Sequence, residues 1–352
     1  MDPQSYASSR RLPRHRLALA AALAASALLA ACGGGDGGST GASTTPLSQS
    51  DATADAANAS ATGSDTASAM DAVVDTTTAL AQAVAQPSGT SAPRLQAESA
   101  PGEASPQAAA PVTTVSVNCA GGGSATLGIA GGTAATQLDG RLDAGEVYTV
   151  TYAQCAGGAG WAQLNGSVEM DVTAADHTSS PSSFSVNLTA TGLTLSLPAG
   201  HATLDGTATV ARSVTTSGSA TLTSSHVSVP SATLATAFNA RTGSFTLAGL
   251  DATRTLTSVN GVVTGSQYSG HHTLSGTAWG RTFSMTVATT GDVDYDAGGA
   301  LVSGAWKVVR PNATVAAAVA DGMVVLTVDD GNDGTIDHTW TFPLAQLGAS
   351  AG

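Results

Sequence analysis

The chain has 352 residues, of which 12 are Lys or Arg and 25 are Asp or Glu, so its formal net charge is −13. Only 11% of the residues are charged and 4% are aromatic, whereas 41 are Gly. From residue 17 onward the chain has 8 basic and 24 acidic residues, with Lys307 as its single lysine, and this part has no basic cluster to neutralise phosphate groups. This composition argues against nucleic acid as a partner and against binding of anionic lipid through the protein surface.

The apolar residues are distributed unevenly along the chain. Leu, Ile, Val and Phe make up six of the 79 residues in 33–111 and 51 of the 241 residues in 112–352. A segment so poor in apolar side chains cannot bury enough surface to offset its backbone entropy. We therefore predict a disordered segment over 33–111, followed by a lightly built folded domain over 112–352.

The N-terminus has the pattern of an export signal. Four arginines lie within residues 10–16, and an uncharged run of Leu, Ala and Ser follows over 17–30. This run is too short to span a bilayer as a helix and has the length of a secretory apolar region. Residues 1–31 are therefore predicted to be a signal peptide.

The residues that end this segment, Leu29-Ala30-Ala31-Cys32, resemble the lipobox of bacterial lipoproteins. The resemblance implies a diacylglycerol on the Cys32 thiol, cleavage before Cys32 and an acylated amino terminus, which together give a stable membrane anchor. In that family an Asp after the Cys commonly signals retention in the inner membrane. Gly33 stands there, so the resemblance implies a lipid anchor in the outer membrane, with the domain on the periplasmic face or the cell surface. The alternative is an ordinary signal peptide with an incidental Cys32.

Residues 33–111 have the composition of a tether rich in Ala, Ser, Thr and Gly. As a flexible coil of this length, its ends would lie roughly 50 Å apart on average. One stretch inside it, 68–86, has apolar residues at helical spacing, with Ser68 as a candidate N-cap. Because isolated helices of this length are poorly stable in water, we expect this helix to be short and marginal.

From Val112 onward the chain alternates between apolar and polar residues. Over 164–172, for example, every even position is apolar or Gly and every odd position is polar, which is typical of a strand with one solvated face. The phase flips at Gly192, which indicates a turn or a bulge. No helical periodicity of useful length follows residue 112, so the predicted fold class is all-β, a large antiparallel meander.

Glycine recurs in this domain after an apolar residue and a second residue, as in Leu164-Asn165-Gly166 and Leu204-Asp205-Gly206. In several copies the Gly shares a face with the apolar residues, where it permits tight bending. This pattern favours a strongly curved sheet or a partly closed barrel. The alternative is a β-sandwich in which these glycines occupy turns.

With Cys32 lipidated, Cys119 and Cys155 remain as one pair. Export places them in an oxidising compartment, and each ends a strand-like run. We therefore predict a disulfide that closes a loop of about 36 residues and stabilises the fold by roughly 4 kcal/mol. The alternative is two free buried thiols.

One acidic stretch is similar to a calcium-binding loop. Over 329–337, Asp329, Asp333, Gly334 and Asp337 fall at matching places of the D-x-[DN]-x-[DN]-G pattern, but Gly331 offers no ligand at the third position. The interpretation is a structural calcium site at Asp329, Asp333 and Asp337, and no other cofactor is expected. The alternative is that these residues fill tight turns between strands.

The sequence contains no recognisable catalytic motif. His271 and His272 are adjacent, and adjacent residues of a strand point to opposite faces, so they do not readily share one metal. We therefore expect a non-catalytic envelope or surface module, anchored to the membrane by lipid and contacting a glycan or a protein through a polar sheet face. The alternative is an exported hydrolase whose site is not visible in the sequence.

Overall fold

The computed structural model describes residues 46–85 and 113–349, apart from 120–121, 134–135, 138, 140, 157–162, 179–180, 198–199, 239–240 and 279–280. The predicted signal peptide, Cys32 and the tether on both sides of residues 46–85 lie outside these residues.

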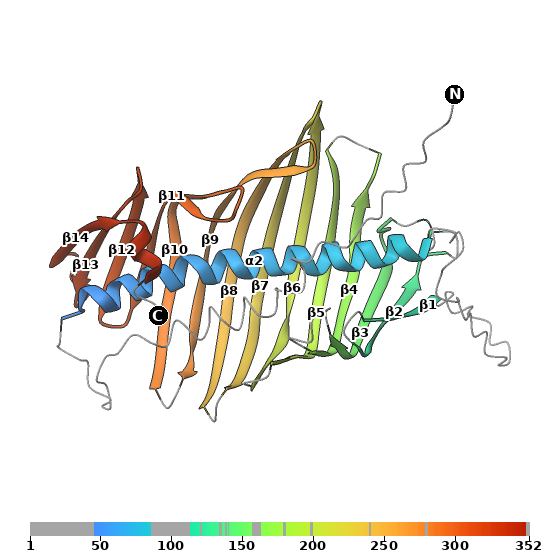
Figure 1. Ribbon diagram of the computed structural model, residues 1–352, viewed down its shortest axis with the longest axis horizontal. Helices are drawn as coiled ribbons and strands as arrows, with labels where there is room; N and C mark the ends of the chain where they lie inside the picture. Colours follow the sequence, from blue (N-terminus) through green and yellow to red (C-terminus); the bar gives the residue numbers. More distant parts are fainter. Residues whose placement is uncertain are drawn as a thin grey trace.

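In the described part of the chain, fourteen strands form one antiparallel sheet in which every strand pairs with its neighbours in chain order (Figure 1). The strands are β1 (Thr113–Asn118), β2 (Ser124–Gly131), β3 (Glu146–Ala156), β4 (Gln163–Asp176), β5 (Ser182–Leu197), β6 (Gly200–Ser217), β7 (Ala220–Phe238), β8 (Arg241–Val259), β9 (Val262–Ala278), β10 (Arg281–Asp296), β11 (Leu301–Arg310), β12 (Ala313–Ala320), β13 (Met323–Asp330) and β14 (His338–Pro343). The predicted antiparallel meander is confirmed, and the strands form a single open sheet rather than a sandwich. Its two edges are β1 and β14.

Alternation along the strands gives the sheet one apolar face, which we call the inner face. On β12, for instance, Ala313, Val315, Ala317 and Val319 are all buried, and the residues between them are more exposed. Because side chains of a strand point alternately to opposite faces, this pattern places the core on the inner face and the Ser and Thr residues on the outer face.

A line of β-bulges crosses the sheet, and we call it the crease. The pairing register shifts between Tyr152 and Cys155 on β3, between Ala190 and Leu193 on β5, and at corresponding places on other strands: Asn165/Ser167 on β4, Thr207/Thr209 on β6, Ala248/Asp251 on β8 and Ala288/Val293 on β10. The bulge at Gly192 accounts for the flip of phase seen in the sequence. Because a bulge bends its strand, bulges aligned across neighbouring strands bend the whole sheet along one line.

Gly166 shows why glycine is needed at the crease. Its φ of +101° is unfavourable for residues with a side chain, and a Cβ there would collide with the carbonyl oxygen of Gly192 on the next strand. Gly166 therefore serves the bend rather than a turn, as the curved-sheet interpretation of the sequence requires.

The disulfide joins Cys119, directly after β1, to Cys155 on β3, with the two Cα atoms 5.3 Å apart. Backbone hydrogen bonds support the same corner, because the N–H of Ala156 donates to the carbonyl of Gly122. The bond fastens the strand at the β1 edge to the third strand of the sheet.

The helix α2 (Gln49–Ala85) is the main difference from the sequence-based expectation. It has 37 residues, begins well before Ser68, and lies across the inner face of the sheet (Figure 1). It runs from β13 toward β6, against the order of the strands, and a short helix α3 (Ala345–Ala349) contacts it. Its buried residues are mostly small, such as Ala52, Ala56 and Ala67. Packing against the sheet, rather than its own apolar periodicity, accounts for its length.

Ion pairs between the helix and the sheet fix the position of α2. Arg212 on β6 donates hydrogen bonds to Asp71 at 2.7 Å and to Asp75 at 2.6 Å, and Arg254 on β8 donates to the second oxygen of Asp71 at 3.1 Å. Burial of Arg212 opposes its charge, but the two carboxylates outweigh burial and raise its pKa.

A second set of polar contacts holds the N-terminal half of α2. Arg310 on β11 donates to Asp55 at 2.8 Å, and the indole N–H of Trp306 donates to the carbonyl of Ala56 at 2.9 Å. Burial raises the pKa of Asp55 to about 6, against the opposite effect of Arg310. The backbone N–H of Leu47 donates to Asp330, so the chain is already attached to β13 before the helix begins.

Gly63 lets the middle of α2 approach the sheet closely. A Cβ at this position would collide with the hydroxyl of Tyr268, and it would lie 3.1 Å from Cε1 of His272. Both residues belong to β9 and are buried. The glycine, which is unfavourable in a helix, is therefore explained by tertiary packing.

We expect Gly63→Ala to lower the melting temperature. In an exposed helix this change stabilises by about 1 kcal/mol, whereas here the added methyl group meets the Tyr268 hydroxyl. Thermal unfolding of wild type, Gly63→Ala, Tyr268→Phe and the double variant tests the contact. Removing the hydroxyl should recover part of the loss, and a melting temperature raised by Gly63→Ala alone would contradict the contact.

We expect Arg212→Met to destabilise the protein strongly, because it leaves the Asp71 carboxylate, only 8% exposed, with Arg254 as its remaining partner. Removing one partner of a buried pair typically costs about 3–5 kcal/mol, and Arg254 should reduce this figure. The matched control is Asp75→Asn, whose carboxylate is 42% exposed and whose loss should cost about 1 kcal/mol or less. Denaturant unfolding measures both changes, and equal losses would contradict the burial argument.

Candidate functional site

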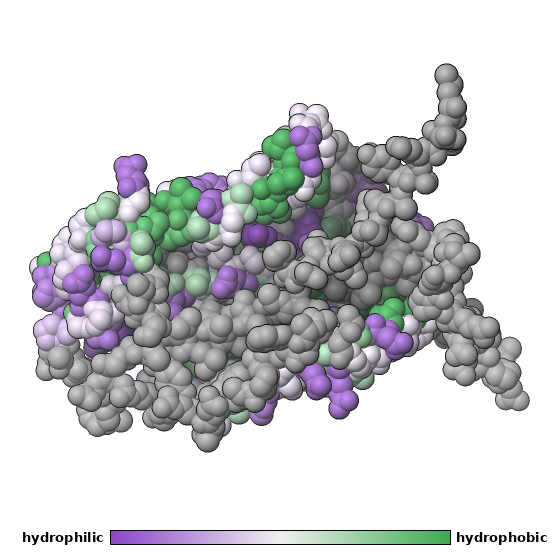
Figure 2. Space-filling view, viewed as in Figure 1, coloured by the Kyte–Doolittle hydropathy of each residue, from purple (hydrophilic) through white to green (hydrophobic). Residues whose placement is uncertain are grey.

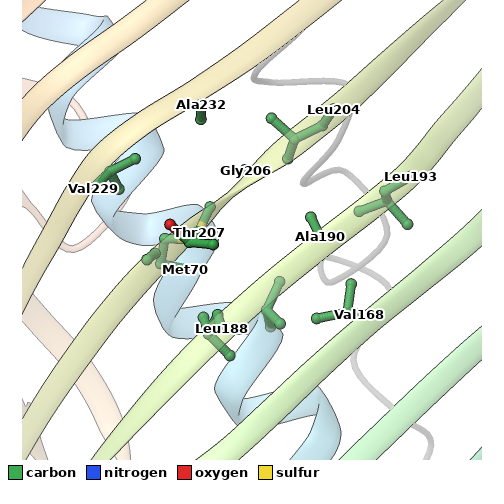
Figure 3. A pocket seen from close by; sticks show the side chains of 12 residues that line it. Met70, Val168, Leu188, Ala190, Leu193, Leu204, Gly206, Thr207, Val229 and Ala232 are labelled. Atoms are coloured by element: carbon green, nitrogen blue, oxygen red, sulfur yellow. The ribbon is translucent and has the colours of Figure 1, made fainter.

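The candidate site is an apolar pocket between α2 and the inner face of β4–β7 (Figure 3). Its empty volume is about 400 Å³, including the part open to solvent. Met70 and Val73 come from the helix, and ten residues come from the sheet: Val168, Leu188, Ala190, Leu193, Leu204, Gly206, Thr207, Ala208, Val229 and Ala232. None of these twelve side chains is ionisable.

The pocket lies where the crease passes under the helix. Ala190 pairs with Gly206, and Gly206 pairs with Ala232, so these three small residues form one row across β5, β6 and β7. The bulges after Ala190 on β5 and after Thr207 on β6 lie directly beside this row. Because the sheet bends here while α2 continues across it, small residues at the bend leave space beneath the helix.

Larger apolar side chains frame this row. Figure 3 shows Leu193 and Leu204 beside Ala190 and Gly206, on the part of the sheet that extends past the helix. Both leucines are only half-buried, whereas Leu188, nearer the helix, is buried. Met70 faces this space from α2, and its unbranched side chain can adopt several shapes.

A second group on the inner face consists of buried polar side chains under Gly63. The Tyr268 hydroxyl and both ring nitrogens of His272 are buried and have no hydrogen-bond partner among the residues that the structure describes. Burial and, to a smaller extent, the neighbouring His271 together lower the pKa of His272 to about 4. His272 is therefore neutral inside the folded protein at neutral pH.

A third polar group surrounds Glu146 at the start of β3. Glu146 is fully buried and accepts hydrogen bonds from the Tyr148 hydroxyl at 2.6 Å and from the N–H of Asp143 at 3.1 Å. Burial, together with the hydrogen bond to Glu146, raises the pKa of Tyr148. These contacts join Asp143, which precedes β3, to Glu146 and Tyr148 on that strand, which is a structural role.

Of the three predicted calcium ligands, Asp329 lies near the end of β13, and Asp333 and Asp337 lie in the loop between β13 and β14. Asp329 accepts hydrogen bonds from the N–H groups of Asp333 and Gly334, both at 3.0 Å. Asp333 accepts from Thr335, and Asp337 accepts from Asp330. In the described part of the chain, no group of three or more His, Cys, Asp or Glu residues is placed to hold a metal ion. The hydrogen bonds that these carboxylates accept tie them to the turn between β13 and β14, and the calcium site at Asp329, Asp333 and Asp337 stays a prediction.

The adjacent residues His271 and His272 lie on opposite faces of the sheet, as expected for neighbours on a strand. His272 is on the inner face, whereas His271 pairs in register with Asp251 on the outer face. His226 also reaches Asp251, with Nε2 3.3 Å from the carboxylate, and Ser228 pairs with Asp251 in register. The side chains of His226 and Asp251 are 50% and 55% exposed, so this group lies on an open surface.

Figure 2 shows apolar residues exposed at the end of the sheet where the β6–β7 and β8–β9 hairpins lie. Leu222, Val259, Val262 and Val263 are the exposed apolar residues of these strands, and Val262 is the most exposed at 67%. They form a further surface that a partner could contact.

None of the residues that line the pocket was predicted from the sequence to belong to a functional site. Met70 and Val73 belonged to the predicted marginal helix, and the remaining residues looked like ordinary strand core. The glycine pattern and the phase flip at Gly192 were the only available signals, because they mark the crease.

The comparisons with known proteins give no match: no family model, no curated protein and no solved structure resembles this chain. Within the described residues, no helix is both long enough and apolar enough to span a membrane.

We expect acid to destabilise the wild type more than His272→Gln. Below the ordinary pKa of 6.5 the unfolded chain binds a proton at this histidine, whereas the folded protein does so only near pH 4. Stability from the buried neutral imidazole is thus present above pH 6.5 and is lost as the pH falls, by about 3 kcal/mol at pH 4.

Denaturant unfolding of both proteins between pH 7.5 and about pH 4 measures this effect. Asp55 acts in the opposite direction, since its raised pKa stabilises the protein as the pH falls below about 6, but this contribution is common to both proteins. A stability difference that stays constant over the whole range would contradict the assignment to His272.

Proposed function

We propose that the protein is a lipid-anchored module of the bacterial outer membrane that acts by binding rather than by catalysis. Cys32 carries the lipid, and the sheet with its helix forms the body that contacts a partner. The lipobox-like residues Leu29-Ala30-Ala31-Cys32 support the anchor, and the disulfide between Cys119 and Cys155 fits an exported protein.

The observation that carries the binding role is the chemistry of the pocket. Its twelve lining side chains include no ionisable group, so the pocket itself holds no general acid or base. Asp71 and Asp75 on α2 are engaged with Arg212 and Arg254 on the inner face, in pairs that hold the helix in place. The pocket thus has the composition of a binding site for an apolar group.

The outer face supplies the surface for a glycan or a protein partner. Thr209, Ser228, Asp251 and His271 pair in register across four neighbouring strands, and they form a polar row that crosses the sheet. Hydroxyl, carboxylate and imidazole groups in such a row can donate and accept hydrogen bonds to a polar partner.

The alternative function is an exported hydrolase. The arrangement that comes nearest to one is Ser228 with His226 and Asp251 on the outer face. Hydrolase sites usually lie in a cleft that binds the substrate, whereas here the His226 and Asp251 side chains are half exposed on an open strand surface. The binding module is therefore the better-supported proposal.

Intact mass and membrane fractionation of wild type, Cys32→Ala and Gly33→Asp test the anchor. The wild type should carry acyl mass and fractionate with the outer membrane, and Cys32→Ala should lack that mass. Gly33→Asp should keep the acyl mass and shift to the inner membrane. Absence of acyl mass on the wild type would overturn the lipid anchor. If the acyl mass is present, cleavage by external protease on whole cells distinguishes a domain on the cell surface from one on the periplasmic face.

A further inference from the structure

We propose that one protruding end of the sheet, which we call the tip, inserts its apolar side chains into the surface of the bilayer that holds the lipid on Cys32. The tip consists of residues 213–225 in the β6–β7 hairpin and residues 255–267 in the β8–β9 hairpin. This inference deepens the proposed function and rests on its lipid anchor.

The pairing of the strands makes the tip project beyond its neighbours. β5 begins at Ser182, which pairs with Val214, so the β6–β7 hairpin continues past the last paired residue of β5. On the other side, β10 ends at Asp296, which pairs with Gly265, so the β8–β9 hairpin continues past β10. The sheet reaches its highest point at this end in Figure 1.

The tip carries an apolar patch and no ionisable side chain, although the protein as a whole is acidic. Val259 and Val262 pair directly across the β8–β9 turn, and Leu222 on β7 pairs with Thr257. Alternation places the two valines and the leucine on the same face, where all three are exposed (Figure 2). These side chains therefore form one uncharged patch on a projecting edge.

The backbone of the tip is suited to contact with lipid, because unpaired backbone groups are costly there. Ser217 pairs with Ala220, and Val259 pairs with Val262, so both hairpins remain paired up to their turns. Most other side chains of the tip are Ser and Thr, whose hydroxyl groups can form hydrogen bonds with lipid head groups. The composition thus matches the boundary between head groups and acyl chains.

Acidic residues at the base of the tip select the kind of lipid. Asp294 and Asp296 on β10 pair with Gln267 and Gly265. Their charges oppose anionic head groups, so the tip fits a zwitterionic bilayer such as phosphatidylcholine. The same carboxylates favour water over lipid, which restricts insertion to the outermost residues of the two hairpins.

The anchor brings a bilayer within reach of the tip. Arg254, which donates a hydrogen bond to Asp71 on α2, lies five residues before Val259 on β8, so the tip extends roughly 17 Å past the helix. The segment 33–46, which leads from Cys32 to the start of the attached body, can span more than twice this distance when extended. An anchored protein can therefore place its tip on the bilayer that holds its own lipid.

An environment-sensitive dye on a cysteine at position 262 measures insertion. In the acylated chain this cysteine is the only free thiol, because Cys119 and Cys155 form a disulfide. The full acylated chain with Val262→Cys, in phosphatidylcholine vesicles, should show blue-shifted emission and quenching by brominated phosphatidylcholine. The matched control, Thr253→Cys, carries the dye on the outer face of β8, roughly 20 Å before Val259, and should stay unquenched.

A charge beside the dye should prevent insertion. Leu222→Asp in the labelled protein should reduce the quenching at least about fivefold, because a carboxylate is costly to transfer out of water. Thr253→Asp adds the same charge away from the tip and should leave the quenching unchanged. Both positions lie on the surface, and thermal unfolding checks that both variants fold as the parent does.

Failure of the tip and failure of the anchor give different results. Equal quenching at positions 253 and 262, or no quenching at 262 while intact mass shows the acyl chains, contradicts tip insertion and leaves the anchor in place. If acyl mass is absent, the anchor fails, and the Cys32→Ala chain with excess vesicles is measured instead. Absence of quenching there also rules out the tip, and an emission shift that grows with protein concentration without vesicles would identify a second copy of the chain as the occupant.

Discussion

The structure depends on charges that α2 carries into the interior of the protein. Asp71 is almost completely buried, and it remains compatible with folding because Arg212 and Arg254 reach it from two strands of the sheet. Asp55 and Arg310 repeat this arrangement toward the other end of the helix. A buried ion pair adds little net stability, but a misplaced one is very costly. The pairs therefore select one position of the helix on the sheet over all neighbouring positions.

Small side chains on α2 determine how closely the helix, positioned by the ion pairs, packs against the sheet. Ala52, Ala56, Gly63 and Ala67 allow the helix to lie close to the sheet, over the buried side chains of Tyr268 and His272. Where the crease turns the sheet away, the same helix no longer touches it everywhere, and an apolar hollow remains. Close packing at one place and open space at another thus come from a single arrangement, a long helix laid across a bent sheet.

The strands could be predicted from the sequence because their signal is local. Alternation along 164–172 and the phase flip at Gly192 mark the strands and a bulge without any knowledge of their partners. The extent of α2 could not be predicted, since its residues contact the sheet through partners far along the chain: Asp71 and Arg212 are 141 positions apart, and Ala56 and Trp306 are 250 apart. The pocket was equally hidden, because it requires the register of four strands and the position of the helix together.

The hydrogen bond between Leu47 and Asp330 also determines how far the body could move from a lipid on Cys32. Only residues 33–46 separate Cys32 from the first fixed residue, so even fully extended this stretch spans about 50 Å. The helix alone, with 37 residues, is about 55 Å long. In an anchored molecule the helix would thus be longer than the extended segment 33–46 that joins the body to Cys32. The body would remain close to the bilayer, with the β13–β14 edge nearest to the anchor. Its partners would have to come to the membrane, since the protein itself could not search the space beyond it.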